Sequence, residues 1–293
     1  MTLKQLMETF PTDDSCKQFL MERRWPNGEV CCVRCGNVKV NALKSRPFHW
    51  VCGGCSPTKR SNYRFSVTVG TPFENTNLPL KTWFEVLWTM LNSKKGVSAL
   101  QISRQIGTTH NTAWYMCHRL RAGMKDDEFK KLMGIVEVDE TYIGGKDKNR
   151  HFDKRSHIPG GSGKTGVIGA ISRKGNVVCK VIERADKETL HSFVQETVSE
   201  NTELVATDEA QGYYGLTRLG YKHGHVRHSQ GEYVHGVVHT QNLDSFWSLL
   251  KRGVMGTYHN VSRKYLPLYL NEFSYRYNNR KNPDIFRHAL PQC

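Results

Sequence analysis

Two pairs of cysteines constrain the fold of this chain more tightly than any other feature of its sequence. Cys32 and Cys35 form one C-x2-C pair, Cys52 and Cys55 form a second, and 16 residues separate the two pairs. Each pair can offer two thiolates to one ion, and two pairs complete the tetrahedral sulfur site that zinc prefers. Short β-prone runs lie between and after the pairs, so the sequence predicts a zinc ribbon. Its zinc would be structural, because four protein ligands leave no open position for chemistry.

The other cysteines follow no such spacing. Cys31 adjoins Cys32 and is an alternative ligand, although Cys32 gives the better-spaced pair. Nine cysteines in a chain without an export signal argue against a disulfide framework. The isolated thiols, which we expect to be buried or idle, are Cys16, Cys117, Cys179 and Cys293.

Charge and hydropathy indicate the class of partner. The chain carries 42 Lys and Arg against 27 Asp and Glu, a net charge of +15. Such an excess favours a polyanion through counterion release and long-range steering. No apolar run approaches the roughly 18 residues of a membrane-spanning helix, and residues 1–5 do not have the form of a signal peptide. We therefore expect a cytoplasmic protein that binds a polyanion and no membrane, and the helix-turn-helix pattern described next indicates that this polyanion is double-stranded DNA.

A helix-turn-helix is expected within residues 72–130. Residues 79–91 have helical periodicity, and residues 98–107 have the form of a short helix that begins at a serine and ends at a glycine. A polar start and a further helix at 112–121 follow, which is the helix-turn-helix pattern; an ordinary αα-hairpin is the alternative. The candidate DNA contacts are Thr109, His110, Asn111 and Thr112, with Arg119 and Arg121 nearer the phosphates.

Three acidic residues stand on three different elements of the remaining chain. Asp139 lies in the apolar run 135–139, Asp208 ends the run 204–208, and Asp244 opens an amphipathic stretch. The expected elements are strands at 135–139, 165–172 and 177–183, a helix at 187–200, a strand ending at Asp208, a strand at 223–228 and a long helix from about 240. This succession is the ribonuclease H-like order: three strands in a meander, then a helix, a parallel strand and later helices. In that order the first and fourth strands are neighbours, so Asp139 and Asp208 should meet.

Convergent carboxylates repel one another unless divalent cations neutralise them, and hard oxygen ligands suit Mg²⁺ or Mn²⁺. Two such ions activate a water or hydroxyl and stabilise the leaving oxygen in phosphoryl transfer. The prediction is therefore an α/β protein with a ribonuclease H-like mixed sheet flanked by helices, preceded by a zinc ribbon and a helix-turn-helix. The expected domains are residues 1–71, 72–130 and 131–293.

A glycine-rich segment at residues 160–165 has the composition of a phosphate-binding loop. It fails on spacing, because Ile158 stands where the first glycine is required. It also precedes a predicted strand instead of following one. We interpret it as a basic loop that does not bind a nucleotide.

Several motifs together resemble those of a known family. They are the runs at 136–146 (VEVDETYIGGK), 206–209 (ATDE), 239–253 (HTQNLDSFWSLLKRG), 256–259 (GTYH) and 271–278 (NEFSYRYN). With the ribbon and the helix-turn-helix, they resemble bacterial insertion-sequence transposases that have an N-terminal zinc ribbon and an ISXO-type DDE catalytic domain. The likeness covers nearly the whole chain. It implies a nucleoid-associated enzyme that binds terminal repeats, cuts DNA to a 3′-hydroxyl and joins it to target DNA without a covalent protein–DNA intermediate. Two element ends imply at least a homodimer on DNA.

The resemblance matches Asp139 and Asp208 to the first two acids of the family. The third position is usually Glu or Asn; the aligned acid here is Asp244, and Asn242 is the alternative ligand. Lys251 follows Asp244 by seven positions, about two helical turns, so both share a face. We expect Lys251 and Arg252 to contact DNA.

The side chains next to these acids have roles that the sequence also predicts. Strand alternation should point Glu140 and Glu209 away from the ions, whereas Glu137 could reach the edge of the site. His239 could move a proton or orient a water. The aromatic pair Phe246 and Trp247 should belong to the core, with base stacking as the alternative. The other histidines are expected to face DNA, and a basic tail to bind phosphate; these residues are His223, His225, His228, His235, Arg276, Arg280 and Lys281.

Three other functions compete with this reading. A non-catalytic DNA-binding regulator derived from a transposase would share the first two domains. A ribonuclease H-like nuclease would cut without joining. A zinc-dependent hydrolase is the weakest, because the well-spaced cysteines are already used in a closed site.

Overall fold

The computed structural model describes residues 1–55, 62–125, 129–145, 164–173, 175–226, 234 and 236–290. The chain forms two compact units, Met1–Lys125 with Asn282–Cys293, and Asp126–Lys281. The boundaries of the three expected domains stay a prediction. The glycine-rich loop at 160–163, Lys146, His228, His235 and Cys293 lie outside the described residues.

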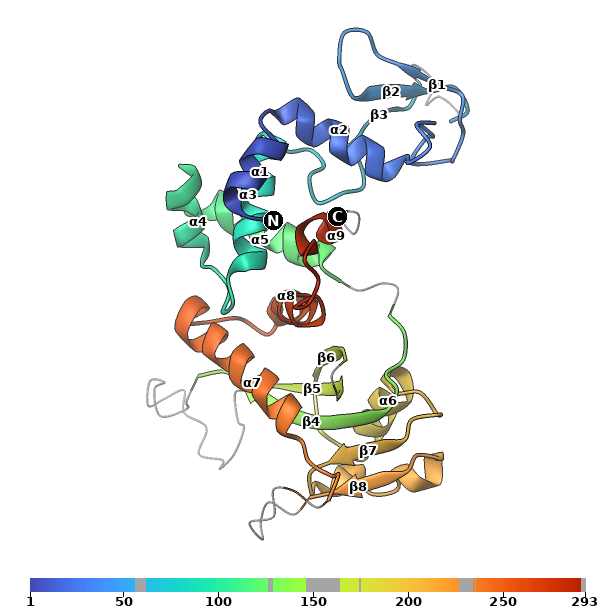
Figure 1. The fold of residues 1–293 in the computed structure, drawn as a ribbon, viewed down its shortest axis with the longest axis vertical. Helices are drawn as coiled ribbons and strands as arrows, with labels where there is room; N and C mark the ends of the chain where they lie inside the picture. The colour runs from blue at the N-terminus through green and yellow to red at the C-terminus, as the bar shows by residue number, and fades with distance from the viewer. Residues whose placement is uncertain are drawn as a thin grey trace. The chain divides into compact units, whose positions relative to one another are not determined.

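A small sheet carries the cysteine pairs in the first unit. The strands β1 (Val40–Ala42), β2 (His49–Cys52) and β3 (Arg64–Ser66) form an antiparallel sheet in the order β1-β2-β3 (Figure 1). Trp50 and Phe65 are paired across β2 and β3, and their rings stack at 5.8 Å between centroids. The zinc-ribbon sheet that the cysteine spacing predicts is confirmed.

Helices complete the first unit: α1 (Leu3–Thr9), α2 (Asp13–Arg24), α3 (Leu80–Asn92), α4 (Ala99–Ile106), α5 (His110–Gly123) and α9 (Ile285–Ala289). Their core holds three phenylalanines in mutual contact, Phe10, Phe84 and Phe286, with ring centroids 5.0 to 6.0 Å apart. Helix α9 therefore contributes Phe286 to the core of the first unit.

Local signals explain why α4 and α5 form where they do. The Ser98 side chain accepts a hydrogen bond from Gln101 N–H and so caps α4, which ends at Gly107 with a φ of 66°. Thr109 caps α5 by accepting from Thr112 N–H. The expected short helix, glycine turn and second helix are present, although α5 begins at His110, two residues before its predicted start.

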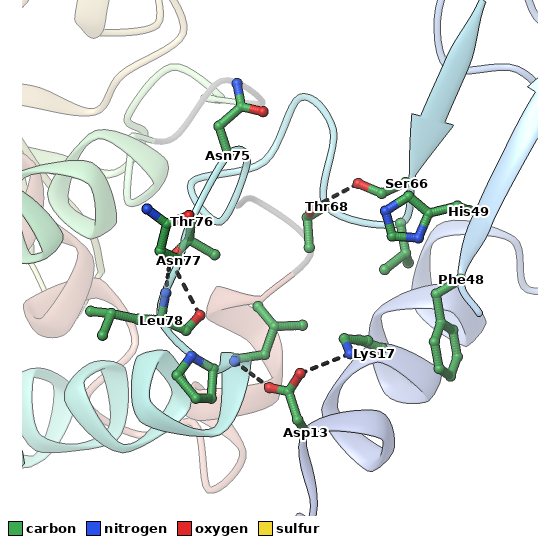
Figure 2. Close-up of a pocket in the computed structure, with 13 residues that line it drawn as sticks. Asp13, Lys17, Phe48, His49, Ser66, Thr68, Asn75, Thr76, Asn77 and Leu78 are labelled. Atoms are coloured by element: carbon green, nitrogen blue, oxygen red, sulfur yellow. Dashed lines mark hydrogen bonds and ion pairs between the residues drawn. The ribbon is translucent and has the colours of Figure 1, made fainter. Parts of the chain in front are cut away.

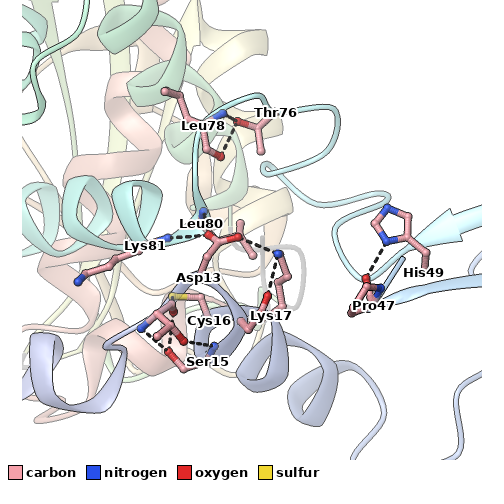
Figure 3. Close-up of polar contacts among 12 residues, drawn as sticks. Asp13, Ser15, Cys16, Lys17, Pro47, His49, Thr76, Leu78, Leu80 and Lys81 are labelled. Carbon is pink, nitrogen blue, oxygen red and sulfur yellow. Dashed lines mark hydrogen bonds and ion pairs between the residues drawn. The ribbon is translucent and has the colours of Figure 1, made fainter. Parts of the chain in front are cut away.

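The start of α3 is capped from another element. Its own N-cap residue, Pro79, provides no side-chain hydrogen bond. Instead the carboxylate of Asp13 accepts hydrogen bonds from the N–H groups of Leu80 and Lys81, and Lys17 Nζ lies 2.8 Å from its other oxygen (Figure 3). A cavity of about 440 Å³ lies beside this cap, lined by residues of α2, the ribbon and the loop before α3 (Figure 2).

The second unit is built on a five-stranded mixed sheet. Its strands are β4 (Ile135–Ile143), β5 (Thr165–Ser172), β6 (Val177–Ile182), β7 (Leu204–Thr207) and β8 (His223–His225), in the order β6-β5-β4-β7-β8. Strands β4, β5 and β6 form the antiparallel meander, while β7 lies parallel to β4 and β8 lies parallel to β7. The ribonuclease H-like order is confirmed, including the adjacency of the first and fourth strands.

Helices cover both faces of this sheet. One face packs against α6 (Lys187–Thr197), with Val136 and Val138 of β4 among the buried residues. The other face packs against α7 (Gln241–Gly253) and α8 (Leu266–Asn278), and α7 crosses β4 and β5 (Figure 1). Since β-strand side chains alternate, Glu137 and Asp139 face α7. In the described part of the chain, no helix has the length and apolar character needed to cross a bilayer.

Candidate functional site

Three carboxylates meet where β4 passes the end of β7. The parallel register pairs Glu137 with Ala206, so Asp139 and Asp208, each two residues further along, stand at the same level. One carboxylate oxygen from each of Asp139, Glu140 and Asp208 lies within 4.8 Å of the others. Hard oxygens at this spacing fit a divalent cation such as Mg²⁺ or Mn²⁺.

Burial and crowding work against ionisation of this cluster. Burial, followed by the charges of Asp208, Glu140 and Asp244, raises the pKa of Asp139 to about 8. Burial also raises the pKa of Glu140, although the Tyr213 hydroxyl opposes this shift. A cation bound among these oxygens would remove the mutual repulsion, because an opposite charge favours the ionised carboxylates.

The expectation that Glu140 stays away from the cluster is wrong. The Glu140 side chain starts on the face of β4 that packs against α6, as the strand alternation predicts. The Tyr213 hydroxyl donates a 2.7 Å hydrogen bond to its Oε2. Because β7 ends at Thr207, no strand of the described residues lies beside β4 on that side at this level. The longer Glu side chain can therefore reach past the sheet edge to Asp208.

Glu137 caps the start of α7. This fully buried carboxylate accepts hydrogen bonds from the backbone N–H groups of Asn242 at 2.9 Å and Leu243 at 3.2 Å. Arg173 Nε donates to it at 2.9 Å and balances its charge. Thr240, the N-cap residue of α7, makes no side-chain cap of its own. Glu137 therefore serves the helix, whereas the sequence suggested the edge of the site.

The two candidates for the third ligand differ in what already holds them. The side-chain N–H of Asn242 donates to Glu137 Oε1 at 2.8 Å, so the cap uses the nitrogen of that amide and orients its oxygen. Asp244 accepts a 3.2 Å hydrogen bond from the Thr240 hydroxyl. Its charge raises the pKa of Asp139, although its oxygens lie outside the 4.8 Å group.

Trp247 makes a polar contact with the cluster that sequence reasoning missed. Its indole N–H donates a 3.0 Å hydrogen bond to Asp139 Oδ2, while the side chain is 3 % exposed. The expected core position is correct. The available signal was the spacing of three from Asp244, which places both residues on one helical face.

One of the predicted histidines, His223, bonds to Thr207 at the end of β7. The Thr207 hydroxyl donates to the carbonyl of Asp208, so His223 Nε2, at 2.8 Å, is the donor to Thr207. Burial, then His225 and His191, lowers the pKa of His223 to about 4. His239 Nδ1 lies 3.2 Å from Glu137 Oε1 without hydrogen-bond geometry. Among the described residues, no histidine joins a three-ligand group.

The predicted phosphate contacts fall into two sets. Lys251, Arg252, Arg280 and Lys281 are exposed. Arg276 is instead 9 % exposed and lies 3.2 Å from the buried Glu272, one helical turn away on α8. The prediction of phosphate binding by Arg276 does not fit this burial, because its guanidinium is needed inside the unit to balance Glu272.

The predicted contacts on the helix-turn-helix divide in the same way. His110 and Asn111 are exposed at the start of α5, beside the Thr109–Thr112 cap. Arg119 donates to the carbonyls of Glu74 at 2.8 Å and Thr71 at 3.4 Å. Arg121 is only 2 % exposed, since it lies on the inner face of α5, so it cannot present its charge to a phosphate there.

The four predicted thiols gather at one point in the ribbon. Sulfur distances are 3.7 Å for Cys32 and Cys55, 3.6 Å for Cys35 and Cys52, and 3.4 Å for Cys35 and Cys55. A tetrahedron with Zn–S bonds of about 2.3 Å has edges of about 3.8 Å, so the group fits zinc. Cys31 is outside this group. A Cβ at Gly54 would come within 1.9 Å of Asn37 Nδ2, so any other residue there would displace the Asn37 side chain.

Two family models match the chain. Residues 131–278 match the ISXO2-like transposase domain, and residues 11–58 match the transposase zinc-ribbon domain. An uncharacterized protein in transposable element ISH50 of Halobacterium salinarum is 27% identical over 282 residues, covering 92% of each chain. That relative is archaeal, so a bacterial origin for this chain stays a prediction.

Solved structures show distant likenesses. The Mos1 strand transfer complex matches with a TM-score of 0.32 and 11% identity, over 71% of this chain and 73% of that one. A chain in the simian T-cell lymphotropic virus intasome bound to the PP2A regulatory subunit B56 gamma matches with a TM-score of 0.33 and 13% identity. That match covers 66% of this chain and 65% of the other.

Proposed function

The chain belongs to the ISXO2-like transposase family, and from that membership we propose that it binds the terminal repeats of a mobile element and transfers DNA strands. Its residues 131–278 are a DDE-type catalytic domain. The proposed reaction cuts DNA at the element end to a 3′-hydroxyl, which then attacks target DNA at the same site.

One observation carries this proposal. Asp139 and Asp208 come from distant parts of the chain, yet their carboxylates converge with that of Glu140 within 4.8 Å. A fold without a bound cation gains nothing from such a group, because burial and like charges both oppose its ionisation. The convergence is therefore best explained by cation-dependent chemistry.

The donor set assigns roles to the residues. Asp139 and Asp208 would hold the ions, with Asp244 as third ligand in preference to Asn242, because Asp244 brings a negative charge that already acts on Asp139. Glu140 is a further oxygen donor at the same point. When bound, two Mg²⁺ or Mn²⁺ ions supply positive charge that activates the attacking hydroxyl and stabilises the leaving oxygen.

Charge distribution supports DNA binding by the first unit. Residues 1–125 and 282–293 hold 19 Lys and Arg against 8 Asp and Glu, and residues 86–125 contain no acidic side chain. We propose that the ribbon and the α4–α5 pair recognise the terminal repeats, with Thr109, His110, Asn111 and Thr112 at the base edges. Lys251 and Arg252 would hold the DNA backbone near the acids. Two element ends require at least a homodimer on DNA, in the cytoplasm at the nucleoid.

The test uses end-containing DNA, Mg²⁺ and the full chain. We expect the parent protein to give cut and joined products, and the variants Asp139→Asn and Asp208→Asn to lose both by at least about a thousandfold while still binding DNA. Glu196→Gln, which alters an exposed carboxylate paired with Lys180, is the matched control. Intact cleavage in Asp139→Asn would refute the assignment. Cut but unjoined product would favour a nuclease, and binding without cleavage by the parent would favour a regulator.

A further inference from the structure

The indole of Trp247 is held against the acidic cluster from two sides. Its N–H lies 3.0 Å from Asp139 Oδ2, and its ring lies over Gly169 of β5. Gly169 is the cross-strand partner of Asp139, so both residues face α7. A Cβ at residue 169 would come within 2.7 Å of two atoms of the ring, Cζ2 and Cη2. The absence of a side chain at Gly169 therefore makes room for the indole to reach Asp139.

The helix that carries Trp247 is fixed by the same strand that carries Asp139. Glu137, two residues before Asp139, caps α7 through Asn242 N–H and Leu243 N–H. Trp247 follows four residues after Leu243, about one turn along the helix. The position of the indole relative to Asp139 is thus set by one strand and one capped helix, with no loop between the cap and the ring.

The indole of a tryptophan can donate a hydrogen bond to Asp139 but cannot bind a cation or add a charge. The indole nitrogen is a donor only, so it cannot bind a cation. It is also neutral, whereas Lys or Arg would form an ion pair that competes with a divalent ion for the carboxylate. An indole N–H can therefore occupy one oxygen of Asp139 without lowering the negative charge that a cation needs.

We propose that Trp247 is a positioning residue that fixes the Asp139 carboxylate through Oδ2 and leaves Oδ1 for a catalytic divalent cation, with Gly169 as the cradle for its ring. This inference rests on the proposed function, because it presumes a cation at the cluster. Trp247 does not touch the DNA or the reacting atoms in this role. Its effect acts through Asp139 alone.

The first test measures Mn²⁺ binding to the DNA-free, zinc-loaded full chain by titration calorimetry. Trp247→Phe keeps an aromatic ring but removes the N–H, and loss of such an outer partner weakens metal binding roughly 10- to 100-fold. Gly169→Ala keeps the indole but pushes it away, so it should weaken binding in the same direction. Trp83→Phe is the matched control, since Trp83 is also buried and donates its N–H, at 2.9 Å, to the Thr76 hydroxyl.

The outcomes separate this inference from the proposed function. Failure of the parent chain to bind Mn²⁺ would overturn the function and the inference together. A parent that binds, with Trp247→Phe binding within about threefold of it, would overturn only the positioning role. Equal weakening in Trp83→Phe would also overturn that role, because it would show a general effect of losing a buried indole.

A second measurement is made on the parent chain and needs only one variant, as a reference. The chain has six tryptophans, and Trp247 is the only one within residues 126–281. In ¹⁵N spectra of the indole N–H groups, substoichiometric Mn²⁺ at the cluster should broaden the Trp247 resonance, because its N–H bonds to a carboxylate of the cluster. A cluster-bound Mn²⁺ that broadens none of the six, with Asp139→Asn as the unbound reference, would show that the indole lies away from the ion.

Discussion

At the scale of single residues, protons and a divalent cation compete for the Asp139 carboxyl group. Its pKa is raised to about 8 from an ordinary value of 3.8 by burial and by neighbouring acids. A carboxyl group whose pKa is raised in the folded state stabilises the fold fully when the pH is below its pKa in the unfolded chain, near 4. That contribution is lost as the pH rises towards 8. The cation-free protein is therefore expected to lose stability over this range.

We predict that Asp139→Asn raises the melting temperature of the cation-free protein at pH 8 and has little effect at pH 4. Each kcal/mol recovered is worth roughly 2–4 °C in a domain of this size. Thermal denaturation followed by circular dichroism measures the shift, and Mg²⁺ should stabilise the parent more at pH 8 than at pH 6. Asp186→Asn is the control, because the backbone N–H of Thr189 at its helix cap lowers the pKa of Asp186. A melting temperature for Asp139→Asn that stays at or below the parent value at pH 8 would contradict the prediction.

At the scale of elements, two helices begin under carboxylates that other elements supply. Asp13 of α2 caps α3, and Glu137 of β4 caps α7. An unpaired helix start leaves backbone N–H groups without partners, and a carboxylate both accepts from them and complements the helix dipole. These caps fix each helix to the element behind it, which matters most for α7, since it carries Asp244, Trp247 and Lys251.

We predict that Glu137→Gln destabilises the catalytic domain by about 3–5 kcal/mol, because it leaves the Arg173 charge without its buried partner. Urea denaturation followed by Trp247 fluorescence, in a chain whose other tryptophans are replaced by Phe, isolates this unit. The matched control is Glu196→Gln. The Lys180–Glu196 pair is exposed, so its loss should cost about 0–1 kcal/mol. Equal effects in the two variants would refute a special role for the cap.

The sequence predicts the strands and helices, and it predicts that Asp139 and Asp208 meet at neighbouring strands. It does not predict where several other side chains lie. Asp139 and Asp208 could be placed together because strand order and apolar runs are local signals. Glu140 could not, since its reach depends on where the neighbouring strand stops. The burial of Arg121 and Arg276 was likewise missed, because helical spacing alone does not say which face meets the core. The Trp247 contact requires the space above Gly169, which exists only after β5 pairs with β4.

At the scale of the whole molecule, positive charge and base-reading groups should affect DNA binding differently. Counterion release makes affinity depend on salt in proportion to the number of phosphate contacts. Base contacts instead discriminate between sequences. Lys251 is an exposed charge on α7, about two turns beyond Asp244, whereas Asn111 is an exposed amide at the start of α5.

We predict that Lys251→Ala weakens binding to all DNA and lowers the slope of log affinity against log salt by about one. Asn111→Ala should keep that slope but reduce the preference for element ends over unrelated DNA, at a cost of about 1–3 kcal/mol per lost base contact. Fluorescence anisotropy at several salt concentrations measures both. Arg263→Ala is the control for charge alone, since Arg263 lies 2.9 Å from the exposed Glu183. If all three variants change the salt slope and the sequence preference alike, net charge governs binding. The proposal that α5 contacts bases while α7 contacts phosphates would then be wrong.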